Sequence, residues 1–313
     1  MVNQLSPETG PEIIVSVSII TYNQKEFVDQ AIRGVLDQKV NFPYEVIIGD
    51  DFSTDGTREI IVDYQRRYPE IIKPILHARR NEGLPGKLNF LSTIGAARGK
   101  YIALLDGDDY WNDQQKLQTQ VDFLESNPDY SICFHRVYDL EPGKTPVFSS
   151  INNPEVETTY TIFDLAKQNM IHTPSVVFRR ITLDELPSWF VVSPVGDYVL
   201  HLLNANKGKI KYFPAPMAVY RKHIGIWSGL SQIQMWEKWL WVLEQLVDYF
   251  RDQPVEKDLK EHRGIILAAL IAFARQRDKD YNDILNSPST AAERLSGKSL
   301  LTALKYKVLR KLR

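Results

Sequence analysis

Short runs of β-branched and aliphatic residues alternate with amphipathic helical patterns over the first hundred residues of the chain. Each short run ends in polar residues, and each helical pattern repeats its apolar positions three to four residues apart. The pattern predicts strands at 13–20, 45–49, 71–77 and 101–105 and helices at 26–38, 57–68 and 88–97. Alternation of this kind is typical of βαβ units, so we expect an α/β fold with a mostly parallel sheet flanked by helices.

The pattern is less regular in the rest of the chain. Asp113 is expected to cap a helix that ends at Asn127-Pro128, and Ser231 marks the start of a C-terminal helical region of about four helices. Strands are expected at 131–138, 174–179 and 209–220, and the Pro-, Ser-, Thr- and Asn-rich stretch 141–159 is expected to be a mobile loop. These elements divide the chain into a tail at 1–12, a main domain at 13–228 and a helical region at 229–313.

Composition and charge exclude several classes of protein. With 313 residues, 43% hydrophobic and 25% charged, the chain has the composition of a globular protein and not of a disordered one. Its 38 basic and 39 acidic residues give a net charge of −1, so no basic field is present to hold nucleic acid and no such partner is expected. The single cysteine, Cys133, excludes an intramolecular disulfide.

The sequence carries no evident membrane-crossing or secretory segment. Residues 1–11 are polar and acidic and lack the basic start and apolar stretch of a signal peptide, so we expect a cytoplasmic protein. The longest apolar stretch, 265–274, is about half of the ~20 residues that a membrane span requires. We therefore expect it to be a buried helix.

Two acidic clusters follow predicted strands. Asp50 and Asp51 come directly after the second strand, and by themselves they are equally well explained as a solvated turn before a helix. Asp106, Asp108 and Asp109 follow the fourth strand, and carboxylates this close repel one another unless a cation neutralises them. Carboxylate oxygens suit Mg²⁺ or Mn²⁺, which would stabilise a departing diphosphate. The sequence has no P-loop, which argues against an ATPase or a kinase.

Four blocks of sequence then occur in a recognisable order. They are Val-Ser-Ile-Ile-Thr-Tyr-Asn at 17–23, Glu-Val-Ile-Ile-Gly-Asp-Asp-Phe-Ser-Thr-Asp-Gly-Thr at 45–57, Ala-Arg-Gly-Lys-Tyr at 97–101 and Asp-Gly-Asp-Asp at 106–109. Together they resemble family 2 of the nucleotide-sugar glycosyltransferases, over roughly residues 13–228. The resemblance implies a Rossmann-like GT-A domain with a C-terminal helical appendage. It also implies an inverting transfer from a nucleotide-diphosphate sugar, assisted by Mn²⁺ or Mg²⁺, to a glycan or lipid-linked acceptor in the synthesis of bacterial surface polysaccharides.

The resemblance also implies the residues of the donor site. Asp51, either alone or together with its neighbour Asp50, would accept the imide N–H of uracil, which points to a UDP-sugar. The other positions implied are Thr21 and Tyr22 at the nucleoside, Arg79 and Lys87 at the base or phosphates, Asp106 at the ribose and metal, and Asp108 on the metal. Phe52 departs from the small residue that family members commonly carry after the two aspartates, so the resemblance leaves the shape of this turn open.

An inverting transfer needs a carboxylate near the acceptor hydroxyl, because an alcohol is a poor nucleophile until its proton is being removed. Asp197 lies at the start of a helical pattern, and periodicity alone would make it only a favourable residue at a helix N-terminus. The resemblance implies instead that Asp197 is the catalytic base.

Further site residues are implied near the end of the main domain. His223 is expected to be a metal or pyrophosphate contact, and Arg221 or Lys222 is expected to neutralise the leaving group. His172 and Trp227 are expected to border the acceptor region.

The last residues of the chain have an uneven charge distribution. Residues 298–313 carry six basic side chains and no acidic one, with Leu and Val on the other side of the expected helix. Such a helix can lie on an anionic membrane and gains about 1 kcal/mol per basic residue near the surface. A helix packed on the domain explains the pattern equally well. Because a lipid-linked acceptor would make attachment useful, our hypothesis is peripheral binding to the inner face of the membrane. An oligomer is also compatible with the sequence.

Two other functions share part of this pattern. A sugar-nucleotide nucleotidyltransferase would also have an α/β sheet and metal-binding carboxylates, but it normally carries a Gly-rich basic loop after its first strand, where this chain has Thr-Tyr-Asn-Gln at 21–24. A non-catalytic nucleotide-binding scaffold would be expected to lose Asp108 or Asp197, and both are present.

Overall fold

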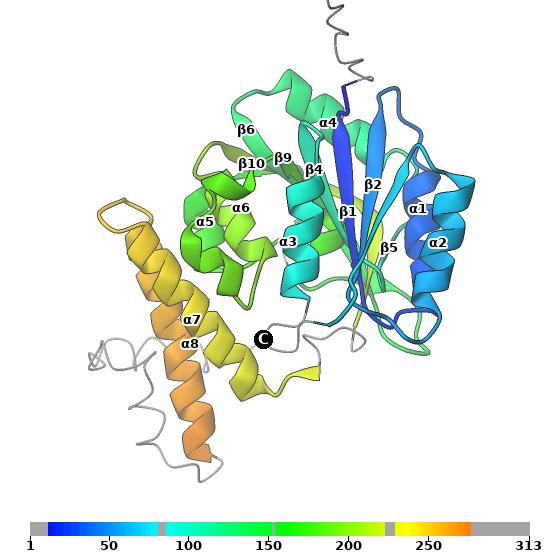
Figure 1. The fold of residues 1–313 in the computed structure, drawn as a ribbon. Coiled ribbons are helices and arrows are strands. Elements are labelled where there is room, and N and C mark those ends of the chain that lie inside the picture. Colours follow the sequence, from blue (N-terminus) through cyan, green and yellow to red (C-terminus); the bar gives the residue numbers. More distant parts are fainter. Residues whose placement is uncertain (1–11, 81–85, 152–153, 223–228, 277–313) are drawn as a thin grey trace, which may run out of the picture.

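The computed structural model describes residues 12–80, 86–151, 154–222 and 229–276, and in these residues a central sheet lies between helices (Figure 1). The strands and helices predicted for the first hundred residues are confirmed, each end within two residues. They are β1 (Val15–Thr21), α1 (Val28–Leu36), β2 (Tyr44–Asp50), α2 (Thr57–Arg67), β3 (Ile72–Leu76), α3 (Lys87–Ala96) and β4 (Tyr101–Asp106).

The first four strands form a parallel half-sheet in the order β3-β2-β1-β4. The chain adds β2 and β3 on one side of β1 and then crosses back to add β4 on the other side. In open α/β sheets, ligands bind at the carboxyl ends of the strands where the order reverses. Here these strands are β1 and β4, and the acidic cluster at 106–109 follows one of them.

The second half of the sheet is mixed. β9 (Val177–Arg179) runs antiparallel to both of its neighbours, β4 and β6 (Tyr130–Leu140). β6 is parallel to β10 (Lys209–Arg221), and β10 in turn pairs antiparallel with the two-residue strand β5 (Tyr110–Trp111). The alternation of apolar side chains does not encode strand direction, so these antiparallel pairings could not be predicted from it.

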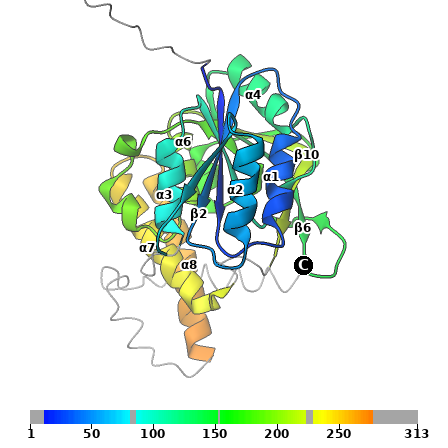
Figure 2. The same ribbon diagram turned by 45° about the vertical axis from the view of Figure 1, so that its right-hand side comes forward.

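Each face of the sheet packs against its own layer of helices (Figures 1 and 2). Along β1, Val15, Val17 and Ile19 are fully buried in an apolar cluster with residues of α1, α2 and α4 (Lys116–Ser126). On the opposite face Ser18 donates a 2.7 Å hydrogen bond to Thr93 Oγ1 of α3. That face also packs against α5 (Ile162–Lys167) and α6 (Asp197–Ala205). Burial on both sides fixes the register of the central strands, because a shift of one residue would exchange their faces.

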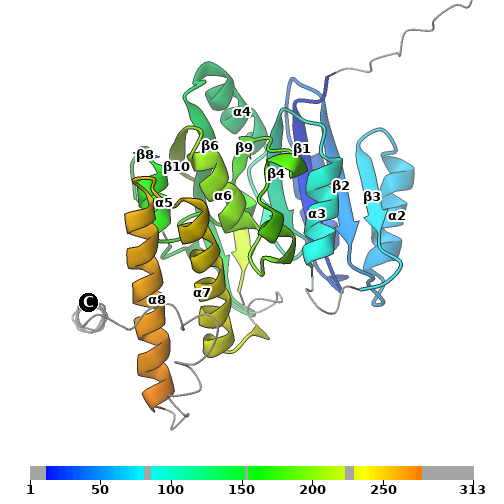
Figure 3. The ribbon, with the colours of Figure 1, turned by 60° about the vertical axis from the view of Figure 1, so that its left-hand side comes forward.

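The C-terminal helices α7 (Gln232–Tyr249) and α8 (Glu256–Gln276) lie side by side at one end of the molecule (Figure 3). The predicted helix start at Ser231 is confirmed: its Oγ accepts a 3.3 Å hydrogen bond from Gln234 N. Val242, Leu243 and Leu246 of α7 belong to the same apolar cluster as α5 and α6. The division between domains near residue 228 stays a prediction.

The apolar stretch 265–274 lies within α8, as expected of a helix, but it is only partly buried: residues 267, 268, 270 and 271 are buried, and 265, 266, 269, 272 and 273 are half-buried. Leu267, Leu270 and Ile271 pack with Leu240 of α7 in a small apolar cluster. None of the helices in the described ranges is long and apolar enough to cross a membrane.

Three local predictions were wrong. The helix expected from Asp113 begins at Lys116 with Gln115 as its N-cap, because the Asp113 carboxylate instead accepts the N–H of Gln115 at 2.7 Å. The strand expected at 174–179 begins only at Val177, since residues 173–175 form a 3-10 turn. The loop expected at 141–159 contains the short strands β7 (Val147–Phe148) and β8 (Thr158–Tyr160), which pair with β6 and β10.

Candidate active site

The carboxyl ends of β1, β2 and β4 lie next to one another. Thr21 is the register partner of Asp50, and Ile20 is the register partner of Asp106. Two backbone hydrogen bonds continue the pairing into the loops: Asp51 N donates to Thr21 O at 3.0 Å, and Gly107 N donates to Ile20 O at 2.9 Å. The two acidic clusters predicted from the sequence are therefore brought to the same edge of the sheet.

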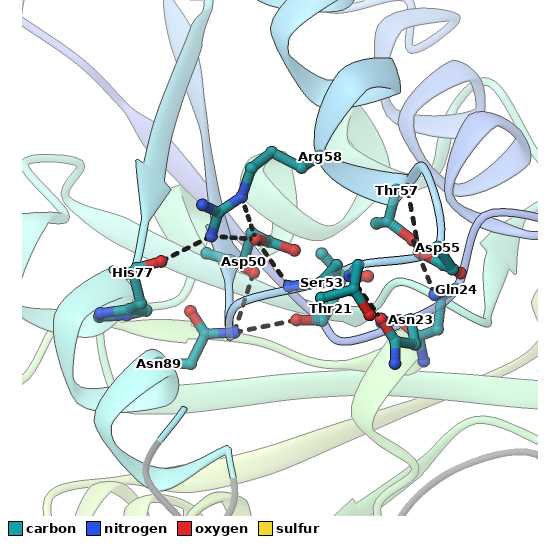
Figure 4. A network of polar contacts seen from close by, with 12 residues as sticks. Thr21, Asn23, Gln24, Asp50, Ser53, Asp55, Thr57, Arg58, His77 and Asn89 are labelled. Carbon is teal, nitrogen blue, oxygen red and sulfur yellow. Dashed lines mark hydrogen bonds and ion pairs between the residues drawn. The ribbon is translucent and has the colours of Figure 1, made fainter. Parts of the chain in front are cut away.

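Hydrogen bonds between two loops stiffen this edge (Figure 4). Asn23 N donates to Ser53 Oγ at 2.8 Å, and Gln24 N donates to Thr57 Oγ1 at 2.8 Å. In return Thr54 N donates to Asn23 Oδ1 at 2.9 Å. The loop after β1 and the loop after β2 are thus held together as one unit beside the acidic residues.

Asp50 is engaged in holding the backbone. Its side chain is fully buried, and Oδ2 accepts hydrogen bonds from Arg58 Nε at 2.8 Å, Arg58 Nη2 at 2.6 Å and Ser53 N at 3.1 Å (Figure 4). Arg58 also donates to His77 O at 2.6 Å. The predicted nucleotide contact of Asp50 stays a prediction, but the structure gives this carboxylate a role in joining α2 to the ends of β2 and β3. Phe52, the unusual residue of this turn, has a left-handed backbone with φ of 67°.

Asp51 has one engaged and one free carboxylate oxygen. Oδ2 accepts a 3.1 Å hydrogen bond from Gly86 N and lies 3.9 Å from Arg80 Nε. Oδ1 is buried and has no hydrogen-bond partner among the described residues. The Arg80 guanidinium lies 3.7 Å from the centroid of the Tyr22 ring, which links Tyr22 to Asp51. An unused acceptor beside a flat aromatic and guanidinium surface suits a nucleobase that offers an N–H.

Arg79, which the sequence predicted at the donor, has an exposed side chain, and its role stays a prediction. Its neighbour Arg80 makes the contacts with Tyr22 and Asp51, and sequence reasoning missed it. The two arginines are adjacent and identical in type, so the sequence alone could not show which of them contacts Tyr22 and Asp51.

The acidic turn after β4 is buried. Burial raises the pKa of Asp106 well above its ordinary value, and the charges of Asp108 and Asp197 raise it further. Burial likewise raises the pKa of Asp108 and, well above its ordinary value, that of Asp109. Gly107 permits this geometry, because a Cβ there would lie 2.8 Å from Thr21 Cβ and 2.5 Å from Gln24 Oε1.

Asp197 is the first residue of α6, as predicted, and it faces the acidic turn. Its Oδ2 accepts a 3.4 Å hydrogen bond from Thr173 Oγ1. Burial raises the pKa of Tyr220 in β10, and the charges of Asp109, Asp106, Asp108 and Asp197 each raise it further. One phenol is therefore near all four carboxylates, although β4 and α6 are about ninety residues apart in the chain. Sequence reasoning missed both Thr173 and Tyr220, because neither residue type stands out there.

Asp106 and Asp108 fit a divalent cation. Their raised pKa values express the cost of burying negative charges close together, and a positive ion would relieve that cost. No group of three or more His, Cys, Asp or Glu side chains is arranged to hold a metal within the described ranges. Two carboxylates completed by substrate phosphate oxygens are typical of Mg²⁺ sites. His223, the third predicted ligand, and Trp227 lie outside the described residues.

Lys87 is the first residue of α3 and is buried. Its Nζ lies 3.6 Å from the centroid of the Phe190 ring and has no hydrogen-bond partner among the described residues. Burial lowers the pKa of Lys87 to about 7, and the negative charge of Asp197 opposes this shift. The ammonium group therefore lies on the Asp197 side of the site.

The basic residues at the end of β10 are already paired. Arg221 Nη1 donates to the carbonyl of Asp108, and Lys222 Nζ forms a 2.6 Å ion pair with Asp139 Oδ2. Their predicted diphosphate contacts stay predictions, but neither side chain is free.

His172 lies beside Tyr220 of β10. Its ring centroid is 5.1 Å from that of Tyr220, and Nε2 lies 2.9 Å from Ser149 Oγ. Burial lowers the pKa of His172 to about 4, so the imidazole is neutral near pH 7. The charge of Asp197 acts on this imidazole, and the predicted position of His172 at the acceptor region stays a prediction.

Comparisons with known sequences identify a family over the part of the chain that carries both acidic clusters. The profile of the family described as Glycosyl transferase family 2 matches residues 16–186. The uncharacterized protein Rv1520 of Mycobacterium tuberculosis is 41% identical over 229 residues, which cover 71% of this chain and 64% of that protein. TuaG of Bacillus subtilis, whose name describes a teichuronic acid biosynthesis glycosyltransferase, is 31% identical over 168 residues, 53% of this chain and 62% of TuaG. The chain thus spans less than two thirds of the length of these relatives.

Solved structures share the fold. TarS 1–349 of S. aureus in complex with UDP-GlcNAc matches with a TM-score of 0.60 and 19% identity, covering 93% of this chain and 80% of that one. The mannosyltransferase PcManGT of Pyrobaculum calidifontis, in complex with GDP-Man and Mn²⁺, matches with a TM-score of 0.59 and 16% identity, covering 97% of this chain and 82% of that one. The expected GT-A fold is confirmed by these matches.

Proposed function

The chain belongs to glycosyl transferase family 2, and from this membership we propose that it transfers a sugar from a nucleotide-diphosphate donor to an acceptor hydroxyl with inversion at the anomeric carbon. One observation carries the proposal. The carboxylates of Asp106 and Asp108, from the turn at the end of β4, and that of Asp197, from the start of α6, converge at the edge of the sheet where the strand order reverses.

The donor nucleoside would bind at the ends of β1 and β2. Asp51 Oδ1 is buried and unpartnered among the described residues, so it can accept the imide N–H of uracil without losing an existing bond. Thr21 Oγ1 is likewise buried without a partner there, and Tyr22 with Arg80 supplies a flat surface for the base. The complex of TarS with UDP-GlcNAc supports a UDP-sugar as the donor.

The diphosphate would lie at the acidic turn. Asp106 would face the ribose and hold a divalent cation together with Asp108. When bound, Mn²⁺ or Mg²⁺ would neutralise the negative charge that grows on the leaving diphosphate. The Mn²⁺ in the complex of PcManGT supports such a cation here.

Asp197 would act as the general base. Its carboxylate would take the proton of the acceptor hydroxyl while the hydroxyl oxygen attacks the anomeric carbon and the bond from that carbon to the diphosphate breaks. The hydrogen bond from Thr173 Oγ1 would orient Oδ2 for this step. Attack opposite the leaving group inverts the anomeric configuration.

The acceptor would be a glycan or a lipid-linked glycan in polysaccharide biosynthesis. The 31% identity to TuaG, whose name places it in teichuronic acid biosynthesis, supports this class. His172 would border the acceptor side of Asp197, whose charge acts on its imidazole, while Lys87 keeps its predicted place at the base or phosphates of the donor.

A donor panel tests the proposal. Release of nucleoside diphosphate is measured for UDP-, GDP- and dTDP-sugars with Mn²⁺ or Mg²⁺ and a mixture of glycan acceptors, and the anomeric configuration of the product is read by NMR. We expect release from one UDP-sugar, dependent on acceptor and cation, and an inverted product. A retained configuration, or the absence of release from every donor, would contradict the proposal.

A further inference from the structure

The guanidinium of Arg221 is enclosed by groups from two distant parts of the chain, residues 27–30 and 108–110. Its Cζ lies 4.8 Å from the centroid of the Phe27 ring and 4.8 Å from that of the Tyr110 ring. Nη1 donates to the carbonyl oxygen of Asp108, and Nη2 donates to Gln30 Oε1 at 2.5 Å. Arg221 thus uses both ends of its planar fork within the protein.

The backbone of Arg221 contacts the same acidic turn. Its N–H donates to Asp109 Oδ1 at 2.7 Å, in line with the pairing of Val219 with Tyr110 between β10 and β5. The side chain therefore holds the carbonyl of Asp108 while the main chain holds the carboxylate of Asp109. Both contacts act on the turn that carries Asp106 and Asp108.

We propose that Arg221 is a positioning residue that fixes the acidic turn so that Asp106 and Asp108 converge on one cation. This inference rests on the proposed function, and it differs from the role implied by the sequence, a direct contact of Arg221 with the diphosphate. The guanidinium acts through the peptide group of Asp108, whose orientation determines the direction in which the Asp108 carboxylate leaves the turn.

The geometry requires arginine and not only a positive charge. A guanidinium is planar, so it can lie between two aromatic rings and still donate to two acceptors in its own plane. A lysine ammonium keeps the charge but cannot bridge the Asp108 carbonyl and Gln30 Oε1 from between the rings. Replacement of Arg221 by lysine therefore removes the positioning of the acidic turn and keeps the positive charge that could neutralise the leaving diphosphate.

The test measures metal and nucleotide binding separately in the full chain. Mn²⁺ binding without nucleotide is followed by the EPR signal of free Mn²⁺, and UDP binding in the presence of EDTA is followed by calorimetry. The variants are Arg221→Lys and Gln30→Ala, with the exposed Arg66→Lys as the matched control. Gln30→Ala removes one partner of the fork and keeps the arginine, so the test does not depend on Arg221→Lys alone.

We expect Arg221→Lys to weaken Mn²⁺ binding about ten- to a hundredfold, as outer partners of metal ligands do, and to leave UDP binding in EDTA within about twofold. Gln30→Ala should weaken Mn²⁺ binding less, and Arg66→Lys should not change it. Unchanged Mn²⁺ binding in Arg221→Lys, loss of UDP binding in EDTA, or a wild-type chain that binds no Mn²⁺ would overturn the inference.

The binding measurements also separate this inference from the proposed function. If the wild-type chain transfers sugar while Arg221→Lys binds Mn²⁺ normally, the inference fails and the function stands. If Arg221→Lys loses Mn²⁺ and the wild-type chain transfers no sugar from any donor, the positioning role stands and the function fails.

Discussion

The guanidinium of Arg80 lies 3.7 Å from the centroid of the Tyr22 ring, and its Nε lies 3.9 Å from Asp51 Oδ2. Because this contact shapes the surface next to the free oxygen of Asp51, we expect Arg80→Ala to raise the KM for the donor about tenfold with little change in kcat. Initial rates at varied donor concentration measure both constants. Arg79→Ala is the matched control, and it should raise the KM less because Arg79 is exposed. An equal or larger effect of Arg79→Ala would contradict this assignment.

Thr173 is expected to affect turnover more than donor binding. Its hydroxyl donates to Asp197 Oδ2 at 3.4 Å, and a hydrogen bond of this length contributes about 1 kcal/mol or less. Thr173→Val keeps the shape and removes the donor, so kcat should fall about three- to fivefold. Thr173→Ser retains the hydroxyl and should restore most of the rate. A valine variant with the wild-type kcat would rule out this orienting role.

Lys116 gives a prediction about stability. It is completely buried in α4, its Nζ donates to Gln120 Oε1 at 2.8 Å, and burial lowers its pKa to about 7 from 10.5. Between these pH values the unfolded chain binds a proton that the folded chain does not. The free energy of unfolding should therefore rise with pH in this window, by up to about 1.4 kcal/mol per pH unit from this group.

Lys116→Met should reduce this pH dependence and raise the free energy of unfolding at pH 7, because a buried ammonium is replaced by an apolar side chain of similar length. Urea unfolding at pH 7, 8 and 9 measures the slope. The exposed Lys257→Met serves as the control and should leave the slope unchanged. If the free energy of unfolding depends on pH equally in the wild type and in Lys116→Met, the buried amine does not cause this pH dependence.

The tail at 298–313, which lies outside the described residues, carries the membrane hypothesis. Its six basic side chains would add about 1 kcal/mol each near an anionic surface. In a flotation assay with vesicles rich in phosphatidylglycerol, the intact chain should float at low salt and residues 1–297 should not. Equal partitioning of the two forms would remove the hypothesis.

The sequence was most informative where burial repeats with a simple period. β1, β2 and β4 are runs of apolar residues that end in polar ones, so their bounds were predicted within two residues. β5 has only two residues, and its pairing with β10 depends on a strand that begins about a hundred residues later. No local pattern encodes such a pairing, and the enclosure of Arg221 by Tyr110 and Phe27 depends on it.

Within the site, the sequence indicated residue types better than their partners. The pattern of carboxylates singled out Asp106 and Asp108, the family resemblance added Asp197, and the structure brings the three together. The same reasoning placed Asp50 beside Asp51 at the nucleobase, and in the structure each carboxylate has its Oδ2 engaged and its Oδ1 without a hydrogen-bond partner among the described residues. What no sequence pattern indicated is which groups hold the two Oδ2 atoms, and the left-handed backbone of the next residue, Phe52, is likewise not expected of a phenylalanine.

The most direct test of the account compares sugar transfer and donor binding in the wild type and in Asp197→Asn, with the donor and cation identified by the panel. Asparagine keeps the size of the side chain and cannot take the acceptor proton, so kcat should fall about 10²- to 10⁴-fold. The Kd for the nucleotide sugar should stay within about threefold, because in the proposed function Asp197 acts on the acceptor hydroxyl and not on the nucleotide. An Asp197→Asn variant that transfers sugar at the wild-type rate would contradict the assignment of Asp197 as the base.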